Sequence, residues 1–203
     1  MPRAHTEDER RTIHERLLRA GRTLFVRVGL QRVTIAELAR AAGIGKGSFY
    51  GFFESKEALF VAVQQREEAA FKGALLAEAE TADSAEQALR ALLTAAATRL
   101  EQHPFLQLLL DPETLRALTL RVAPELLEAH RREDEAFFAR LVARWQQRGW
   151  LRADLDPDQV FSVLGALFII SAHRDLLGAA TTQLASHTIV DALIKDWGSL
   201  SDP

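Results

Sequence analysis

The sequence predicts an all-α protein, in which an N-terminal three-helix head is followed by a helical body. Apolar residues recur at helical spacing along most of the 203 residues. Capping residues, prolines and glycines divide this pattern into segments of ordinary helix length. No segment alternates apolar and polar residues for long enough to form a strand. We therefore expect a helix-turn-helix domain over residues 1–55 and a second domain over residues 56–203.

The first helix of the head is expected over residues 8–28. Ile13, Leu17 and Phe25 lie on one apolar stripe of this segment, while arginines occupy mostly the other face. Gly29 follows the last apolar residue and is typical of a C-terminal cap.

The next two helices are short and close together. Thr34 and Glu37 have the spacing of a capping box, and Gly43 ends the helix that they begin. A third helix is expected from Lys46 to Phe53. Two helices joined by a glycine-containing turn have the layout of a helix-turn-helix. Any other small helical bundle is the alternative at this point.

Caps and breaks also divide the body. Asp83 is expected to begin a helix, and Asp111 and Asp156 each precede a proline at a first helical position. Gly149 and Gly178 are expected to end helices. The expected helices span residues 55–79, 84–102, 104–120 with an optional break at Asp111, 124–148, 157–177 and 182–197.

Composition excludes several classes of function. The chain has no cysteine, which excludes disulfides, thiol catalysis and cysteine-ligated zinc. Its six histidines include no i, i+4 pair, so we expect no metal site and no cofactor. The motifs of serine hydrolases, zinc proteases and phosphate-binding loops are missing, which disfavours an enzyme. No apolar run reaches membrane-spanning length and the N-terminus lacks a signal peptide, so we expect a cytoplasmic protein without a membrane partner.

Charge is distributed unevenly along the chain. Residues 1–60 hold eleven Lys and Arg against seven Asp and Glu, whereas residues 61–203 hold fourteen against twenty-one. The head is therefore basic and the body acidic. This asymmetry indicates that the head is the part that meets a polyanion.

The segment from Thr34 to Phe60 reads TIAELARAAGIGKGSFYGFFESKEALF. In the order and spacing of its GKGSFY and SKEAL motifs it resembles the DNA-binding head of the tetracycline-repressor (TetR) family. The resemblance covers roughly residues 10–62. It implies that the chain is a transcriptional regulator whose body senses a ligand and forms dimers.

Several residues of this segment suit contact with DNA. Gly45, Gly47 and Ser48 are short, which lets a recognition helix approach the major groove, and Lys46 can reach a phosphate or a guanine edge. Phe49 is expected to touch a thymine methyl group, with a core position as the alternative. The predicted DNA-binding residues are Thr34, Gly45, Lys46, Gly47, Ser48, Phe49, Tyr50 and Lys56.

The remaining members of that set act through phosphates. Tyr50 offers its hydroxyl group, with a packed core position as the alternative. Thr34 and Lys56 stand at helix N-termini, where the resemblance assigns backbone contacts, although Thr34 can act only as a cap. We interpret Arg3, Arg10 and Arg11 as a solvated charged face, with DNA contacts as the alternative.

Two positions depart from the family pattern. Members often carry an aromatic residue and then His or Tyr after the tyrosine, whereas this chain has Gly51 and Phe52, which lack side-chain donors. We therefore expect fewer phosphate contacts, and a shallower salt dependence of DNA binding, than in a fully equipped member.

The last two helices of the body are expected to form the dimer interface. The helix at 157–177 is apolar over much of its circumference, and a helix of this kind has to be covered on several faces. Pairing with a two-fold mate is what the resemblance implies, and burial in the chain's own core is the alternative. The predicted interface residues are Phe161, Leu164, Phe168, Leu184, Val190, Ile194 and Trp197.

A regulatory pocket is expected between the head and the interface. Ordinary core packing is the alternative for every residue in it. The candidate pocket residues are Phe105, Leu109, Phe138, Trp145 and Phe168.

These observations give one expected function and one alternative. The chain is expected to be a ligand-responsive repressor, which binds a palindromic operator in double-stranded DNA as a homodimer and is released by a small apolar or amphipathic effector. The resemblance further implies that the effector acts by moving the helix at 55–79 and so the two heads. The alternative is a ligand-sensing or interaction module that has lost DNA binding.

Overall fold

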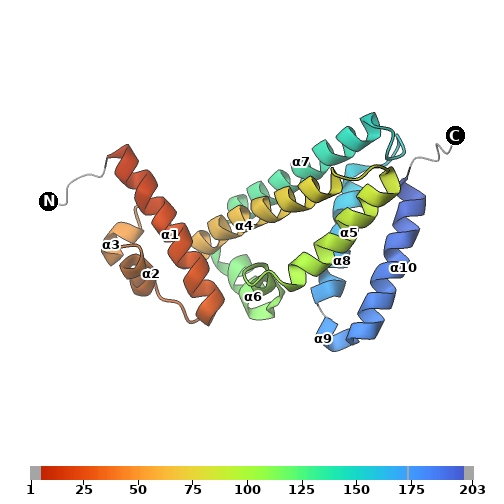
Figure 1. The fold of residues 1–203 in the computed structure, drawn as a ribbon. Helices are drawn as coiled ribbons and strands as arrows, with labels where there is room; N and C mark the ends of the chain where they lie inside the picture. Colours follow the sequence, from red (N-terminus) through yellow and green to blue (C-terminus); the bar gives the residue numbers. More distant parts are fainter. Residues whose placement is uncertain (1–5, 173, 199–203) are drawn as a thin grey trace. The chain divides into compact units, whose positions relative to one another are not determined.

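The computed structural model describes residues 6–172 and 174–198, except for the side chains of residues 97, 98, 101, 168, 171, 172, 174 and 175. It confirms the all-α fold (Figure 1). Within the described residues the only β-type pairing is one isolated bridge between Leu151 and Gly198. No helix of this part of the chain is long and apolar enough to cross a membrane.

The chain forms two compact units, each of which combines two separate stretches of the sequence. The first unit consists of residues 1–68 and 104–127, and the second of residues 69–103 and 128–203. Helix α4 (Lys56–Ala79) contributes its first half to one unit and its second half to the other. These units follow packing alone, so the functional division at residue 55 stays a prediction.

The head begins with α1 (Glu7–Val28), which Thr6 and Glu9 start with a capping box. α2 (Ile35–Ala41) has the capping box that the sequence predicted. Gly29 and Gly43 follow these two helices with φ of 81° and 72°, values that glycine adopts without strain.

The third helix is shorter than predicted. α3 spans Lys46–Phe49, whereas the sequence predicted a helix as far as Phe53. The amide of Gly51 donates to Ser48 O and that of Phe52 to Phe49 O, so the chain tightens into a turn instead of adding helical residues. Gly51 favours this early end, since glycine disfavours a helix interior.

The rest of the first unit packs against the head. Ser55 begins α4, because its Oγ accepts from the amide of Ala58 at 3.0 Å. The break at Asp111 is confirmed: a 3₁₀ helix, η1 (Leu106–Leu110), precedes it, and Asp111 then caps α6 (Pro112–Arg121). The buried rings of Phe60 and Phe105 lie 4.8 Å apart between centroids, which joins α4 to the segment before η1.

The second unit holds the remaining helices, with the second half of α4 and most of α7. They are α5 (Ala85–Glu101), α7 (Pro124–Gln147), α8 (Pro157–Ala172), α9 (Arg174–Leu177) and α10 (Ala179–Trp197). Helices α5, α8 and α10 pack against one another (Figure 1).

Two helix starts in this unit differ from the prediction, and the helix predicted over 157–177 is assigned as α8 and α9. Ser84 rather than Asp83 caps α5, because the Ser84 hydroxyl accepts from the amide of Gln87. α10 begins at Ala179 instead of residue 182, directly after Gly178, whose φ is 84°. Gly149 ends α7 as expected, with a φ of 71°.

Candidate nucleic-acid interface

The start of α3 presents a run of exposed residues. Gly45, Lys46, Gly47 and Ser48 are all exposed, and Tyr50 just beyond them is 53% exposed. The core alternative for Tyr50 is therefore wrong. Lys46 makes no hydrogen bond or ion pair with another described residue. A cation and a phenol hydroxyl group thus face outward beside short side chains.

The two glycines leave open space on this surface. A Cβ atom added at Gly47 would meet no atom of the chain within 4 Å, and one at Gly45 would meet only Ser48 Oγ at 4.0 Å. Internal packing therefore does not require glycine at either position. The lack of side chains gives an external partner close access to the backbone of α3.

The structure corrects the prediction for Phe49. Its side chain is completely buried, and its ring packs edge-on against Tyr50 and at a tilt against Phe53. Burial of the Phe49 ring is favourable because α3 is short and has few other side chains that can pack it against the rest of the head. Phe49 is a core residue, as the alternative interpretation had it, and its ring does not face a DNA base.

Thr34 is exposed and acts as the cap of α2. Its hydroxyl accepts from the amide of Glu37 at 3.3 Å, and Glu37 Oε2 accepts from the Thr34 hydroxyl at 2.7 Å and from its amide at 2.9 Å. The hydrogen bond from the Thr34 hydroxyl, followed by that from its backbone, lowers the pKa of Glu37.

Lys56 is held by the head itself, which the sequence did not predict. Its Nζ donates to the carbonyl oxygens of Gln31 and Val33, each at 2.9 Å. Partial burial lowers the pKa of its ammonium group. Its ammonium therefore braces the loop between α1 and α2, and contact of Lys56 with a DNA phosphate stays a prediction.

Arg10 lies on the turn that follows α3. Its Nη2 donates to Gly51 O at 3.1 Å, and its Cζ lies 5.0 Å from the centre of the Phe52 ring. The sequence analysis interpreted this arginine as part of a solvated face. The interpretation fits Arg11, which is 78% exposed and pairs with Asp8, whereas Arg3 lies outside the described residues.

Comparison with known proteins agrees with this geometry. The profile of the family described as "Bacterial regulatory proteins, tetR family" matches residues 17–63, which include α2, α3 and the start of α4. Residues 17–63 therefore form a DNA-binding head of the TetR type, which confirms the resemblance of this segment.

Curated relatives match this chain over a third of its length or less. The HTH-type transcriptional repressor NemR of Escherichia coli K12 is 42% identical over 67 residues, which are 33% of this chain and 32% of NemR. The uncharacterized HTH-type transcriptional regulator YerO of Bacillus subtilis is 45% identical over 47 residues, 23% of this chain and 16% of YerO. The chain thus matches about a third or less of the length of these curated relatives.

Solved structures extend the likeness of fold to nearly the whole chain. A TetR-family regulator from Pectobacterium atrosepticum has a TM-score of 0.69 at 22% identity, with 98% of this chain and 100% of that one covered. The TetR-family repressor FadR of Thermus thermophilus, in complex with lauroyl-CoA, has a TM-score of 0.64 at 20% identity, with 89% and 92% covered.

The predicted pocket residues are divided between the two units. Phe105 and Leu109 belong to the first unit, and Phe138 and Trp145 to the second. Trp145 is buried in the core of the second unit, in agreement with the alternative of core packing. The side chain of Phe168 lies outside the described residues.

The residues predicted for the dimer interface differ in how far they are buried in the chain itself. Val190 and Trp197 are buried in the chain's own core, so their assignment to the interface is wrong. Phe161, Leu164 and Ile194 are partly buried, with the Phe161 ring 5.6 Å from that of Phe138. The exposed apolar residues at this end of the second unit are Leu184, predicted from the sequence, and Ile169, Leu176 and Leu177.

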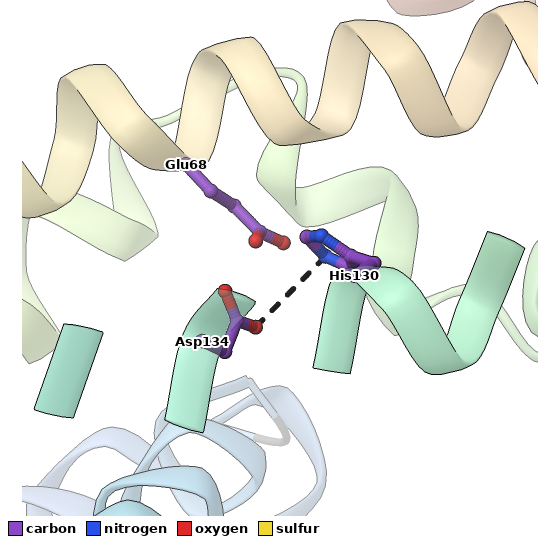
Figure 2. A group of neighbouring side chains, drawn as sticks. All are labelled: Glu68, His130 and Asp134. Atoms are coloured by element: carbon purple, nitrogen blue, oxygen red, sulfur yellow. Dashed lines mark ion pairs between the residues drawn. The ribbon is translucent and has the colours of Figure 1, made fainter. Parts of the chain in front are cut away.

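Charged side chains on α7 form two further clusters in the second unit. Asp134 pairs with Lys72 of α4. The other carboxylate oxygen of Asp134 lies 3.9 Å from His130 Nε2 (Figure 2). Glu68, which Figure 2 also draws, belongs to the first unit.

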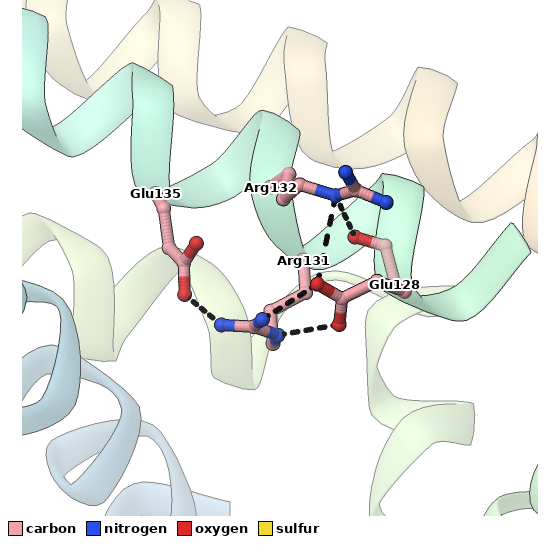
Figure 3. Close-up of polar contacts among 4 residues, drawn as sticks. All are labelled: Glu128, Arg131, Arg132 and Glu135. Carbon is pink, nitrogen blue, oxygen red and sulfur yellow. Dashed lines mark hydrogen bonds and ion pairs between the residues drawn. The ribbon is translucent and has the colours of Figure 1, made fainter. Parts of the chain in front are cut away.

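The second cluster is a network of surface ion pairs. Arg131 bonds Glu128 and Glu135, and Arg132 approaches Glu128 at 3.5 Å (Figure 3). The hydrogen bond from Arg131 lowers the pKa of Glu128. The paired residues lie three or four positions apart on one helix, as expected of a solvated face that supports its own helix.

Proposed function

We propose that this chain is a repressor that binds a palindromic operator as a homodimer and is released by a small apolar or amphipathic effector. Exposed residues of α3, Lys46, Gly47, Ser48 and Tyr50, would enter the major groove, and Thr34 would contact the adjoining backbone. Two heads per dimer would fit half-sites about 34 Å apart, one turn of the double helix. This function would act where the DNA lies, in the cytoplasm.

The observation that carries this proposal is the open, unpaired start of α3. Lys46 is exposed without an internal partner, and Gly47 leaves room that the fold does not use. A surface cation without a partner gains most from a phosphate or a guanine, since both accept its hydrogen bonds. The match of residues 17–63 to the TetR family supports the same reading.

Selection of bound duplexes from a random DNA pool tests the proposal directly. We expect recovery of a sequence with two-fold symmetry, because a two-fold dimer presents the same helix to each half-site. A recovered motif without such symmetry would contradict the homodimer, and recovery of no motif would contradict sequence-specific binding.

Replacement of Lys46 separates recognition from folding. Lys46→Ala is expected to weaken binding to the recovered operator, while the melting temperature changes by no more than about two degrees, as for most exposed positions. Isothermal titration and a thermal melt measure both. A large loss of thermal stability would instead show that Lys46 has a structural role.

The proposed effector is a molecule with an apolar part. Support comes from the many partly buried aromatic and aliphatic side chains of the second unit, and from the lauroyl-CoA complex of the T. thermophilus FadR, which shares the fold. Lauroyl-CoA and free coenzyme A form a matched pair of probes. Release of the operator by the first alone would identify an acyl-binding regulator, and release by neither would exclude that class.

The second candidate is a module that has lost DNA binding. It is favoured by Gly51 and Phe52, which offer no side-chain donor to phosphate. The two candidates differ in the low-salt behaviour of the wild-type protein. A chain that shifts no fragment of its own upstream DNA, even at low salt, would be the module and not the repressor.

A further inference from the structure

The turn after α3 carries a cation from another helix. Arg10 comes from the first half of α1, 41 residues before Gly51. One guanidinium nitrogen donates to the Gly51 carbonyl at 3.1 Å, and the guanidinium carbon lies 5.0 Å from the Phe52 ring centre. The side chain is therefore held at two points, on the two residues that follow the exposed Tyr50 in the sequence (Figure 1 shows α1 and α3).

Neither contact neutralises the charge of Arg10. A carbonyl oxygen and an aromatic ring attract a cation, but neither carries a formal negative charge that would neutralise it. No carboxylate among the described residues pairs with Arg10, whereas its neighbour Arg11 bonds Asp8 at 2.7 Å. Arg10 is exposed, and its guanidinium has further N–H donors besides the one that bonds Gly51 O.

We propose that Arg10 is a phosphate-binding residue of the α3 interface, which supplies from α1 the donor that Gly51 and Phe52 lack. This assignment rests on the proposed function. The planar guanidinium fork matches two phosphate oxygens, which a lysine ammonium does not.

The two contacts also lower the entropic penalty of binding. An arginine that is free in solution loses most of its rotamer freedom when it grips a phosphate. Here the bond to Gly51 and the contact with Phe52 already restrict the side chain. Gly51 and Phe52, which look like losses in the sequence, therefore form the support that positions Arg10.

The test compares Arg10→Ala with Arg11→Ala in the full-length chain. Both variants remove one exposed positive charge from the same turn of α1, so they change the net charge equally. The probes are the duplex recovered from the random pool and a scrambled duplex of the same length, each titrated over a range of salt concentrations. Circular dichroism melts of both variants accompany the titrations.

For Arg10→Ala we expect an affinity loss of about ten-fold or more for the dimer, on both duplexes, since phosphate contacts carry little sequence information. The slope of log affinity against log salt should become shallower by about 1.8, which corresponds to one lost phosphate contact per protomer. Arg11→Ala should keep the wild-type slope. Arg10→Lys should keep the slope but bind more weakly than the wild type.

Other outcomes overturn the assignment. If Arg10→Ala matches Arg11→Ala in affinity and slope, Arg10 does not touch phosphate. If Arg10→Ala lowers the melting temperature and the affinity but leaves the slope unchanged, Arg10 only braces the turn. Wild-type protein that recovers no DNA motif would overturn the proposed function and this assignment together.

Discussion

Lys46 and Lys56 have opposite surroundings. Lys46 is exposed and has no internal partner among the described residues, whereas Lys56 donates to the carbonyls of Gln31 and Val33. Both were predicted to contact DNA, because both occupy motif positions at helix starts. Sequence alone did not separate them, since the acceptors of Lys56 are backbone groups more than twenty residues upstream.

This contrast predicts different effects of substitution. Lys56→Met keeps the aliphatic stem but leaves two carbonyl groups without their donor, so we expect a loss of about 1–3 kcal/mol in the free energy of unfolding. Urea unfolding followed by circular dichroism measures it. Lys46→Ala is the control and should have the stability of the wild type. If Lys56→Met is also as stable as the wild type, Lys56 does not brace the loop between α1 and α2.

Glu37 predicts how acid affects the head. Its hydrogen bonds from Thr34 lower its folded pKa below the unfolded value, so its contribution to stability is present above the unfolded pKa and is lost as pH falls through the folded pKa. Glu37→Gln keeps an acceptor at the cap but does not titrate. The melting temperature of Glu37→Gln should therefore fall less steeply as the pH is lowered than that of the wild type. Parallel plots of melting temperature against pH would contradict this prediction.

At the scale of elements, the short α3 shows how recognition and stability compete. Gly47 lies in this helix, yet a Cβ there would meet nothing within 4 Å. Glycine in a helix interior is less favourable than alanine by about 0.5–1 kcal/mol. Glycine therefore makes α3 less stable at the position where, in the proposed complex, the helix would approach the DNA.

Gly47→Ala should therefore have opposite effects on folding and binding. We expect the melting temperature to stay constant or rise by a few degrees, while affinity for the recovered operator falls because the new methyl group meets the DNA. Gly43→Ala is the matched control: its φ of 72° disfavours alanine, so it should lower the melting temperature. Unchanged affinity of Gly47→Ala would place α3 further from the DNA than we propose.

Helix positions were predictable where capping chemistry is local. The Thr34 cap, the break at Asp111 and the end at Gly149 all depend on neighbours within a few residues, and each is confirmed. The inward face of α8 was not predictable, because a helix that is apolar on most sides has no periodicity to choose a face. On α10, Val190 and Trp197 were misassigned because the sequence does not tell whether an apolar side meets the chain's own core or a partner.

The same limit applies to the candidate site. Exposed Lys46 and Tyr50 follow from the motif, whereas the burial of Phe49 depends on how tightly α3 packs. The position of Arg10 on Phe52 joins residues some forty positions apart, and no local pattern predicts such a contact.

At the scale of the whole molecule, the proposed dimer needs a surface that the chain does not cover itself. Leu184 is 70% exposed on α10, and Ile169, Leu176 and Leu177 are exposed in the same part of the sequence. Large exposed apolar residues that gather in this way are typical of interfaces. The buried Val190 and Trp197 would then support the surface from beneath.

Leu184→Arg should disrupt this proposed dimer without unfolding the protomer, because the side chain has little internal packing to lose. Sedimentation equilibrium measures the mass, and operator binding should weaken with it. Leu120→Arg is a matched control, since Leu120 of α6 is also 70% exposed but lies in the first unit. A dimer that survives Leu184→Arg would exclude this residue from the interface.

The shared core of residues 1–68 and 104–127 has a consequence for chimaeric regulators. Grafting residues 1–68 alone onto the helices of another regulator would separate Phe60 from Phe105, two buried rings that pack against each other. A graft that also carries residues 104–127 would keep them together. A graft of this unit therefore needs both stretches, residues 1–68 and 104–127. A graft of one stretch alone would expose apolar surface and is expected to aggregate.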